Sequence, residues 1–320
     1  MTRTWFITGA NRGLGRAFTV AALGVGDRVV ATARDPRTMA DLSDDRLIVL
    51  PLDVRDRAAV VDTVRTALAR TDGIDVVVDN AGYGLVGAIE ELSETQVREQ
   101  MEVNFFGALW VSQAIAPHMR ERGSGRIVQI STVGAVGSLP LFGAYNASKW
   151  ALEGFSAALA DELRPFGVHV TLAQLGGFAT DWATSSMRFG TALPAYDDVR
   201  ERILGLSTYP ESQVGTQGTT APAAKDSTAP QPTAAGTPPT ESAETDPTTP
   251  APGAPETDAA QAEWIDAPPE VAARALLELV NMPNPPLRKI IGPGAHQMVT
   301  MALDQRRIDY LTDPEFAWPA

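Results

Sequence analysis

A tyrosine and a lysine stand four residues apart in the stretch AYNASKWALEGF, residues 144–155. In a helix this spacing places Tyr145 and Lys149 one above the other on the same face. An ammonium group one turn away favours tyrosinate and so lowers the pKa of the phenol, which is ordinarily about 10. The pair can therefore act as a proton donor and acceptor near neutral pH. Out of context, the alternative is a lysine packed along a surface tyrosine.

A second stretch could bind phosphate. The segment TGANRGLG, residues 8–15, follows an apolar run and opens a helical pattern. Glycines at positions 9, 13 and 15 let the backbone turn tightly and approach a pyrophosphate, whose charge is favoured by the unpaired N–H groups of a helix N-terminus. The segment predicts a dinucleotide site, and a purely structural glycine turn is the alternative.

The pattern around these stretches predicts the elements that hold them. Apolar runs rich in Val and Ile alternate with helical patterns over the first 180 residues, which is typical of βαβ units and of a parallel sheet covered on both faces. We expect one doubly wound (Rossmann) α/β domain with about seven strands. Strands are predicted at 4–8, 28–33, 47–52, 74–78, 126–131, 168–175 and 288–292, and helices near 13–23, 57–69, 95–119 and 145–164.

Residues 215–263 differ from the rest of the chain because they contain no Val, Ile, Leu, Met or aromatic residue. Such a segment cannot bury enough apolar surface to offset the entropy of ordering, so we predict that it is disordered. Downstream, APPEVAARALLELV resumes a helical pattern and LRKIIG is typical of a strand. The prediction is a single domain over 1–320 that carries an insertion, which is either an idle tether or a segment that recruits a partner.

Composition argues against several classes of function. The net charge is −13, and residues 207–268 hold nine acids and one lysine, so the remainder carries about −5, unlike a basic nucleic-acid-binding face. The chain has no Cys, and its three His are scattered, so no metal site is predicted. No G-x-S-x-G motif indicates a serine hydrolase. No apolar run approaches the ~20 residues of a membrane span, and a cytoplasmic protein is expected.

The order and spacing of several motifs resemble the classical short-chain dehydrogenase/reductase family. The glycine turn has the form T-G-x-x-x-G-x-G, and it is followed by DNAG at 79–82, IST at 130–132, YNASK at 145–149 and LGGFAT at 175–180. ATARDP, NAGYG and KWALEGF are most similar to the subgroup that includes 17β-hydroxysteroid dehydrogenase type 1-like enzymes. The resemblance implies hydride transfer between a nicotinamide cofactor and a secondary alcohol or ketone. It also implies a homodimer or homotetramer formed through the helices at 95–119 and 145–164.

The resemblance implies roles for five catalytic residues. Tyr145 is the acid/base, Lys149 tunes it and also binds the nicotinamide ribose, and Asn104 holds a water that resupplies the proton. The family usually has a serine thirteen residues before the tyrosine, and this position is Thr132 here. Threonine offers the same O–H donor with a stiffer χ1. Ser131 is the substitute if Thr132 is not the catalytic hydroxyl.

Residues after the second strand favour NADP(H) over NAD(H). An acid at the end of that strand would accept from the ribose 2′-hydroxyl, but the family register places Ala33 there, and Arg34 follows it. Arg34, with Arg12 from the glycine turn, can bind a 2′-phosphate. Asp35 is a complication that lies two positions past the selecting residue. The alternative is that both arginines only face water.

The full set of cofactor residues follows from the motifs. Asp53 is placed beside the adenine by the resemblance, and a helix N-cap is its alternative role. Two positions depart from the family pattern, because Asp79 replaces an asparagine and Leu175 replaces a proline. The predicted cofactor residues are Thr8, Gly9, Asn11, Arg12, Gly13, Leu14, Gly15, Arg34, Asp53, Val54, Asn80, Ala81, Gly82, Tyr145, Lys149, Gly176 and Thr180.

A largely apolar substrate wall is also predicted. Ligands of open α/β sheets lie beyond the carboxyl ends of the strands, which points to residues 83–86, 138–142 and 178–189. Their large apolar side chains are Leu85, Leu139, Leu141, Phe142, Trp182, Met187 and Phe189. These favour a lipophilic secondary alcohol or ketone, although they could equally be ordinary core. The competing function is a non-catalytic NADP(H)-sensing regulator on the same fold.

Overall fold

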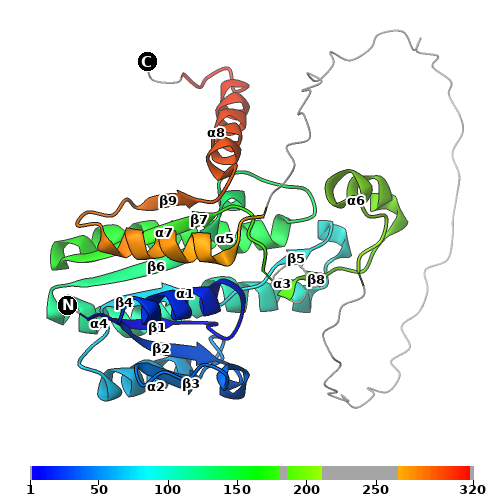
Figure 1. Cartoon of the computed structure of the whole chain (residues 1–320). Helices are drawn as coiled ribbons and strands as arrows, with labels where there is room; N and C mark the ends of the chain where they lie inside the picture. The colour runs from blue at the N-terminus through cyan, green and yellow to red at the C-terminus, as the bar shows by residue number, and fades with distance from the viewer. Residues whose placement is uncertain (1, 181–185, 211–265, 318–320) are drawn as a thin grey trace, which may run out of the picture. The chain divides into compact units, whose positions relative to one another are not determined.

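The computed structural model describes residues 2–180, 186–210 and 266–317. Its main sheet has seven parallel strands in the order β3-β2-β1-β4-β6-β7-β9 (Figure 1). The strands are β1 Thr4–Ile7, β2 Arg28–Ala33, β3 Leu47–Pro51, β4 Val76–Asp79, β6 Gly125–Thr132, β7 Val168–Leu175 and β9 Arg288–Ile291. The predicted doubly wound sheet is confirmed. The order reverses between β1 and β4, and in such sheets ligands bind beyond the strand ends at this reversal.

Helices cover both faces of the sheet because the strands bury side chains on both sides. Helices α1, Gly13–Gly24, and α7, Pro269–Asn281, pack side by side on one face (Figure 1). The other face is covered by α2, Arg57–Arg70, α4, Gly107–Arg122, and α5, Gly143–Leu163. In β1, Trp5 and Ile7 pack under α1, whereas Phe6 packs under α2 and α4. Burial of each such side chain contributes about 1.5–3 kcal/mol.

The single long helix predicted at 95–119 is wrong in detail. Helix α3, Glu94–Met101, runs into a π-helical turn at Glu102–Phe106, and α4 follows. A π turn holds an extra residue, and this redirects the side chains that follow it. Asn104 lies in this turn and is 1% exposed. The π turn was not predicted, because one extra residue in a helical turn changes the spacing of the apolar residues too little.

A small lobe lies beside the carboxyl end of the sheet. Strand β5, Leu85–Val86, pairs in parallel with β8, Arg188–Phe189, and helix α6, Asp197–Leu204, packs nearby. The buried Arg200 of α6 forms ion pairs with the buried Glu91 and with Asp197. This buried pair ties α6 to the segment after β5. Helix α6 was not predicted, since eight residues dominated by charge carry little apolar periodicity.

The C-terminal part of the described chain joins the same sheet. β9 pairs with β7, and Ala179 donates its backbone N–H to the carbonyl of Ala267. Helix α8, Ala295–Leu311, is anchored by Ala295 and Val299 against Val133 and exposes most of its other side chains. The segment 215–263, predicted to be disordered, lies outside the described residues.

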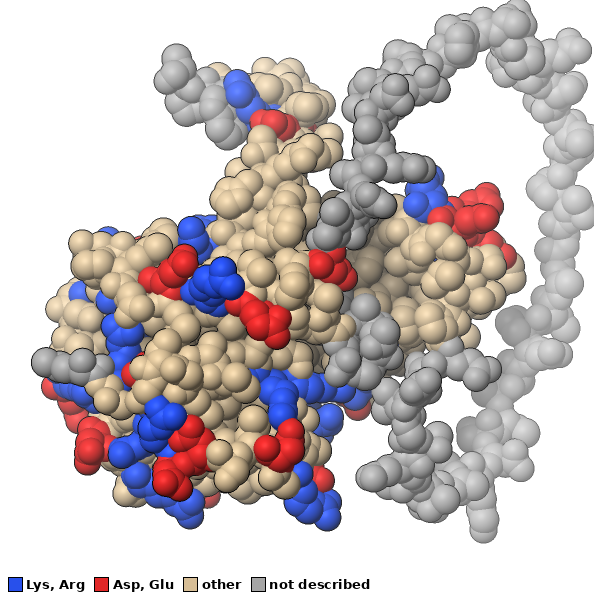
Figure 2. All heavy atoms as spheres, viewed as in Figure 1, with Lys and Arg blue, Asp and Glu red and all other residues tan. Residues whose placement is uncertain are grey.

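Figure 2 shows acidic and basic side chains intermingled on the side of the molecule that is in view. Within the described part of the chain, no helix is both long and apolar enough to cross a membrane.

Candidate active site

The turn between β1 and α1 is shaped for a close approach of phosphate. Gly9 and Gly13 have φ angles of +62° and +52°, a region that favours glycine. A Cβ on Gly15 would lie 2.3 Å from the carbonyl oxygen of Gly9, so no side chain fits there. Arg12 is the N-cap residue of α1 and makes no side-chain capping bond to it. The first-turn N–H groups are therefore not satisfied by a side-chain cap, which suits a pyrophosphate.

Thr8 and Asn80 brace the glycine turn against the end of β4. The Thr8 hydroxyl accepts hydrogen bonds from the backbone N–H groups of Asn80 and Ala81, at 2.9 and 3.0 Å. The Asn80 amide donates to the carbonyl oxygens of Thr8 and Gly9, at 2.9 and 3.1 Å. The structure therefore brings the first and second cofactor motifs together. Asn11 and Leu14, both half-buried, complete the turn.

The arginine after β2 is exposed and lies near Asp53. A side-chain hydrogen bond from Arg55 is the largest cause that lowers the pKa of Asp53, and the charge of Arg34 lowers it further. The alternative role of Asp53 as a helix cap is wrong, because Asp56 caps α2 by accepting from the backbone N–H of Ala59. Val54 is buried next to Gly107 at the start of α4.

Asp35 forms an ion pair with Arg37. Its carboxylate accepts from the backbone N–H of Arg37 at 3.0 Å and from two nitrogens of that guanidinium at 2.8 and 2.9 Å. These hydrogen bonds lower the pKa of Asp35. The carboxylate that could have competed for a ribose hydroxyl is thus paired with Arg37.

Asn104 connects the π turn to the loop after β4. Its side-chain oxygen accepts from the backbone N–H of Tyr83 at 3.1 Å, and its amide donates to the Tyr83 carbonyl at 2.9 Å. The same amide donates to the Ser148 hydroxyl at 3.2 Å. A Cβ on Gly82 would lie 3.2 Å from the Asn104 oxygen and 3.6 Å from Lys149 Nζ. A side chain at position 82 would therefore crowd Asn104 and Lys149.

The two candidate hydroxyls at the end of β6 point to different partners. The Ser131 hydroxyl is buried and donates to Glu153 Oε1 at 2.8 Å. Thr132 Oγ1 accepts from the backbone N–H of Gly134 at 3.2 Å and shares a side-chain hydrogen bond with Tyr145. Successive side chains of a strand face opposite sides, which explains the split. The geometry favours Thr132, and not Ser131, as the partner of Tyr145.

The pKa of Tyr145 differs from the sequence expectation. Burial raises the pKa of Tyr145 to about 12, and the hydrogen bond with Thr132 opposes that rise. The expected lowering was wrong in sign for the protein by itself, because removal of the phenol from water disfavours tyrosinate. The phenol therefore holds its proton at neutral pH.

Lys149, one helical turn after Tyr145, is a buried cation. Its Nζ donates to the carbonyl oxygen of Ile130 at 2.7 Å. Burial lowers the pKa of Lys149 to about 8, while the charges of Glu153 and Asp79 raise it. The ammonium form therefore dominates at neutral pH and is lost as the pH rises through about 8.

Asp79, which replaces the family's asparagine, is fully enclosed. Its Oδ2 accepts from Gln129 Nε2 at 2.9 Å and from the Ser112 hydroxyl at 3.3 Å. Burial raises the pKa of Asp79 to about 8, against the opposing hydrogen bonds and the charge of Lys149. At neutral pH this side chain is mostly a neutral acid, similar in shape and charge to the amide that it replaces.

The loop after β7 returns to the glycine turn. Gly176 donates its N–H to the carbonyl of Ile291 at 2.9 Å, which anchors the loop although Leu175 replaces proline. A Cβ on Gly13 would lie 3.6 Å from Cβ of Thr180. Thr180 therefore lies beside the glycine turn, as the motif order predicts.

Comparison with known proteins decides the family. Residues 3–189 match the family model described as short chain dehydrogenase. The chain belongs to the short-chain dehydrogenase/reductase family. This confirms the resemblance. Proteins of this family are oxidoreductases that bind a nicotinamide cofactor.

Individual relatives agree with this membership. The chain is 41% identical over 200 residues to "Oxidoreductase BOA17" of Botryotinia fuckeliana, which covers 61% of this chain and 73% of that protein. It is 39% identical over 186 residues to human 17-beta-hydroxysteroid dehydrogenase type 1, covering 53% and 55% of the two chains. A crystal structure of a short-chain dehydrogenase from Streptomyces avermitilis has 30% identity and a TM-score of 0.75, covering 97% of this chain and 95% of that one.

In this short-chain dehydrogenase/reductase, only part of the predicted substrate wall assembles. Leu141, Phe142, Met187 and Phe189 gather in one apolar cluster with residues of α6. Leu85 is instead fully buried in a separate cluster, and the other predicted members are exposed (Leu139) or lie outside the described residues (Trp182). This apolar cluster also includes residues of α6, which was not predicted from the sequence.

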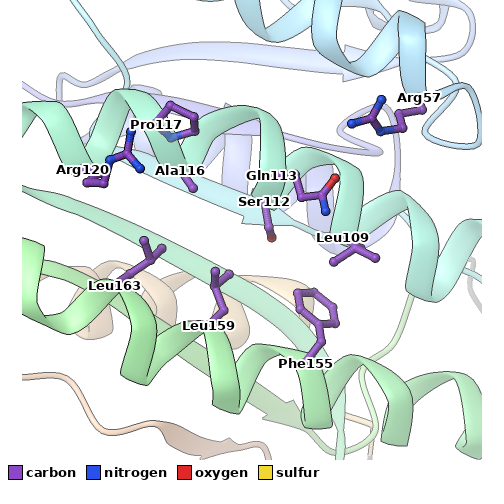
Figure 3. A pocket seen from close by; sticks show the side chains of 10 residues that line it. All are labelled: Arg57, Leu109, Ser112, Gln113, Ala116, Pro117, Arg120, Phe155, Leu159 and Leu163. Atoms are coloured by element: carbon purple, nitrogen blue, oxygen red, sulfur yellow. The ribbon is translucent and has the colours of Figure 1, made fainter.

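A groove elsewhere on the molecule is not part of this site. It has a volume of about 470 Å³ and lies between α4 and α5 (Figure 3). Figure 3 shows Phe155 and Leu159 of α5 facing α4, with Arg57 coming from α2. Its lining is Arg57, Leu109, Ser112, Gln113, Ala116, Pro117, Arg120, Phe155, Leu159 and Leu163. None of the predicted catalytic residues lines it.

Two functional features were missed by sequence reasoning. Glu153 contacts the end of β6 and lies one turn beyond Lys149, and that i,i+4 spacing was the available signal. The Glu91–Arg200 pair that holds α6 joins residues more than a hundred positions apart, and no local signal predicts it. Among the described residues, no group of three His, Cys, Asp or Glu is placed to hold a metal ion.

Proposed function

We propose that this chain is an NADP(H)-dependent oxidoreductase that interconverts a lipophilic secondary alcohol and the corresponding ketone. The observation that carries the proposal is the grouping of Tyr145, Thr132 and Lys149 beside the glycine turn and the Asn80–Gly82 loop. This grouping lies at the carboxyl ends of β4 and β6, next to the reversal of strand order.

Each of these residues has its own role in proton transfer during ketone reduction. NADPH supplies the hydride when it is bound. The Thr132 hydroxyl donates to the carbonyl oxygen, and Tyr145 gives its proton to the same oxygen as the alcohol forms. In this proposal Lys149 stabilises the tyrosinate that is left, and Asn104 holds the water that resupplies the proton. A phenol that holds its proton at neutral pH suits the reducing direction.

The cofactor preference rests on charge at the end of β2. Arg34 is exposed there, and Asp35 is paired with Arg37. A 2′-phosphate would meet a guanidinium, while the 2′-hydroxyl of NAD would find no unpaired carboxylate at this place among the described residues.

The substrate class rests on the cluster beside α6. Leu141, Phe142, Met187 and Phe189 supply an apolar surface. Arg188, which stands between two of them, is paired with Glu99 and lies over the Tyr83 ring at 4.6 Å. Its charge is therefore committed within the protein, which favours an uncharged substrate over a carboxylate or a phosphate.

Turnover with a panel of apolar ketones tests this function. We expect NADPH oxidation, followed by the nicotinamide absorbance, with at least one aliphatic or polycyclic ketone. Tight NADPH binding without oxidation by any ketone of the panel would contradict the proposal and would instead support a nucleotide-sensing regulator.

Replacement of the two hydroxyls should have unequal effects. Thr132→Ala should lower kcat by roughly 10²-fold, because it removes a donor to the developing oxyanion, and Thr132→Ser should restore most of it. Ser131→Ala should leave kcat nearly unchanged and cost about 1 kcal/mol of unfolding free energy, since Glu153 loses one donor. Steady-state kinetics and urea unfolding measure both effects. Full turnover by both alanine variants would overturn the assignment of the catalytic hydroxyl.

We further propose that two copies pair through α4 and α5. The groove between these helices is lined mainly by apolar side chains, and a second copy would cover it. Leu109→Arg should raise the dimer dissociation constant at least about tenfold, because an unpaired charge would be buried. Sedimentation velocity measures this, with Val61→Arg on the exposed face of α2 as the matched control. Identical sedimentation of Leu109→Arg and wild type would contradict the pairing.

A further inference from the structure

Lys149 is a buried cation without a direct ion pair among the described residues. It is 6% exposed, and its Nζ donates to the carbonyl of Ile130. An isolated buried ammonium is expensive, so its charge must be compensated by groups that face it. The charged groups that act on it are Glu153 on its own helix and Asp79 on β4, and Asn104 in the π turn borders the same space beside Gly82.

Glu153 is the compensating carboxylate, and it lies one helical turn beyond Lys149 on α5. It is 7% exposed, and both of its carboxylate oxygens accept hydrogen bonds. Oε1 accepts from the Ser131 hydroxyl at 2.8 Å and from Gln174 Nε2 at 2.9 Å, and Oε2 accepts from Arg288 Nε at 2.8 Å. An ionised carboxylate can accept hydrogen bonds at both oxygens, and the contact with Arg288 is an ion pair.

Asp79 cannot replace Glu153 in this role at neutral pH. Its Oδ1 is buried and makes no hydrogen bond, so only one of its two oxygens is engaged. Its proton is held to about pH 8. Glu153 is therefore the carboxylate near Lys149 that has both of its oxygens engaged by donors.

We propose that Glu153 is a positioning residue of the active site whose buried carboxylate holds Lys149 in its ammonium form. The residue acts through Lys149 and touches neither substrate nor cofactor. The same carboxylate also takes the Ser131 hydroxyl away from the site, which leaves Thr132 facing Tyr145. The inference rests on the proposed function for its catalytic meaning, but the charge coupling itself is independent of turnover.

Direct titration of the lysine tests the coupling. The chain has only three lysines, Lys149, Lys225 and Lys289, so the side-chain signals of carbon-13-labelled lysine can be resolved and assigned by single Lys→Arg variants. In wild type, the Lys149 signal should titrate with a midpoint near 8. In Glu153→Gln, which keeps the size of the side chain, the midpoint should fall by about one pH unit. Glu153→Asp, which keeps the charge, should restore part of the shift.

The matched control is Glu162→Gln, the same substitution at an exposed glutamate of α5, which should leave the Lys149 midpoint unchanged. A folded Glu153→Gln protein with the wild-type midpoint would overturn the proposal. If Glu153→Gln does not fold, Arg288→Gln takes its place, because removal of the guanidinium from Oε2 should move the Lys149 midpoint upwards. An unmoved midpoint in that variant would equally overturn the proposal.

Turnover gives the second readout. The alkaline limb of the pH profile of kcat should move to lower pH in Glu153→Gln, in step with the Lys149 titration, while a purely structural role would lower stability without moving that limb. If no ketone is reduced at all, the proposed function fails, but the lysine titration still decides whether Glu153 holds the ammonium form.

Discussion

Tyr145→Phe is expected to lower kcat for ketone reduction by about 10³-fold, with the dissociation constant of NADPH changed only a few-fold. Phenylalanine preserves the ring but removes the proton donor, and the partner hydroxyl of Thr132 loses its hydrogen bond. The proton would then have to come from water, whose entry this partly buried position limits. Steady-state kinetics and fluorescence titration with NADPH separate the two quantities.

The matched control for this prediction is Tyr310→Phe, at an exposed tyrosine of α8, which should behave as wild type in both measurements. Turnover by Tyr145→Phe within a few-fold of wild type would show that another group supplies the proton.

Arg34→Asp is expected to reverse the cofactor preference. The substitution places a carboxylate at the end of β2, where it would repel a 2′-phosphate and accept a hydrogen bond from a ribose 2′-hydroxyl. The loss of one charge-assisted contact is about 1.5–3 kcal/mol, so KM for NADPH should rise by roughly 10- to 100-fold while KM for NADH falls. The ratio of kcat/KM for the two cofactors is the measurement.

Arg65→Asp, at an exposed arginine of α2, controls for the change in net charge and should leave the cofactor ratio unchanged. A wild-type preference for NADH, or an Arg34→Asp ratio equal to that of wild type, would contradict the assignment of Arg34.

The sheet could be predicted because its signal is local. Each of the seven strands is an apolar run rich in Val or Ile, and all seven appear within two residues of the predicted ends. Strand β4 extends one residue beyond its prediction because Asp79 pairs with Gln129 of β6. The π turn, α6 and α8 were not predicted, because their stability depends on contacts with distant residues such as Glu91 and Val133.

The site was predictable to the level of its motifs and no further. The spacing of residues along the sequence identified Tyr145 and Lys149. It did not determine which of two neighbouring hydroxyls, Ser131 or Thr132, faces the tyrosine. The hydroxyl that faces Tyr145 is determined by the alternation of side chains along β6 and by Glu153 of α5, which accepts a hydrogen bond from Ser131. In the protein by itself the pKa of Tyr145 is raised and not lowered, because the extent of burial is a property of the folded chain.

Transfer of a labelled hydride tests the central claim most directly. The enzyme would be given NADPH that carries deuterium at the reactive position of the nicotinamide, together with an apolar ketone, and the alcohol would be analysed by mass spectrometry. We expect an alcohol that is heavier by one deuterium at the carbinol carbon, formed by wild type and about 10³-fold more slowly by Tyr145→Phe. Binding of the labelled NADPH with no deuterium in any product would contradict it.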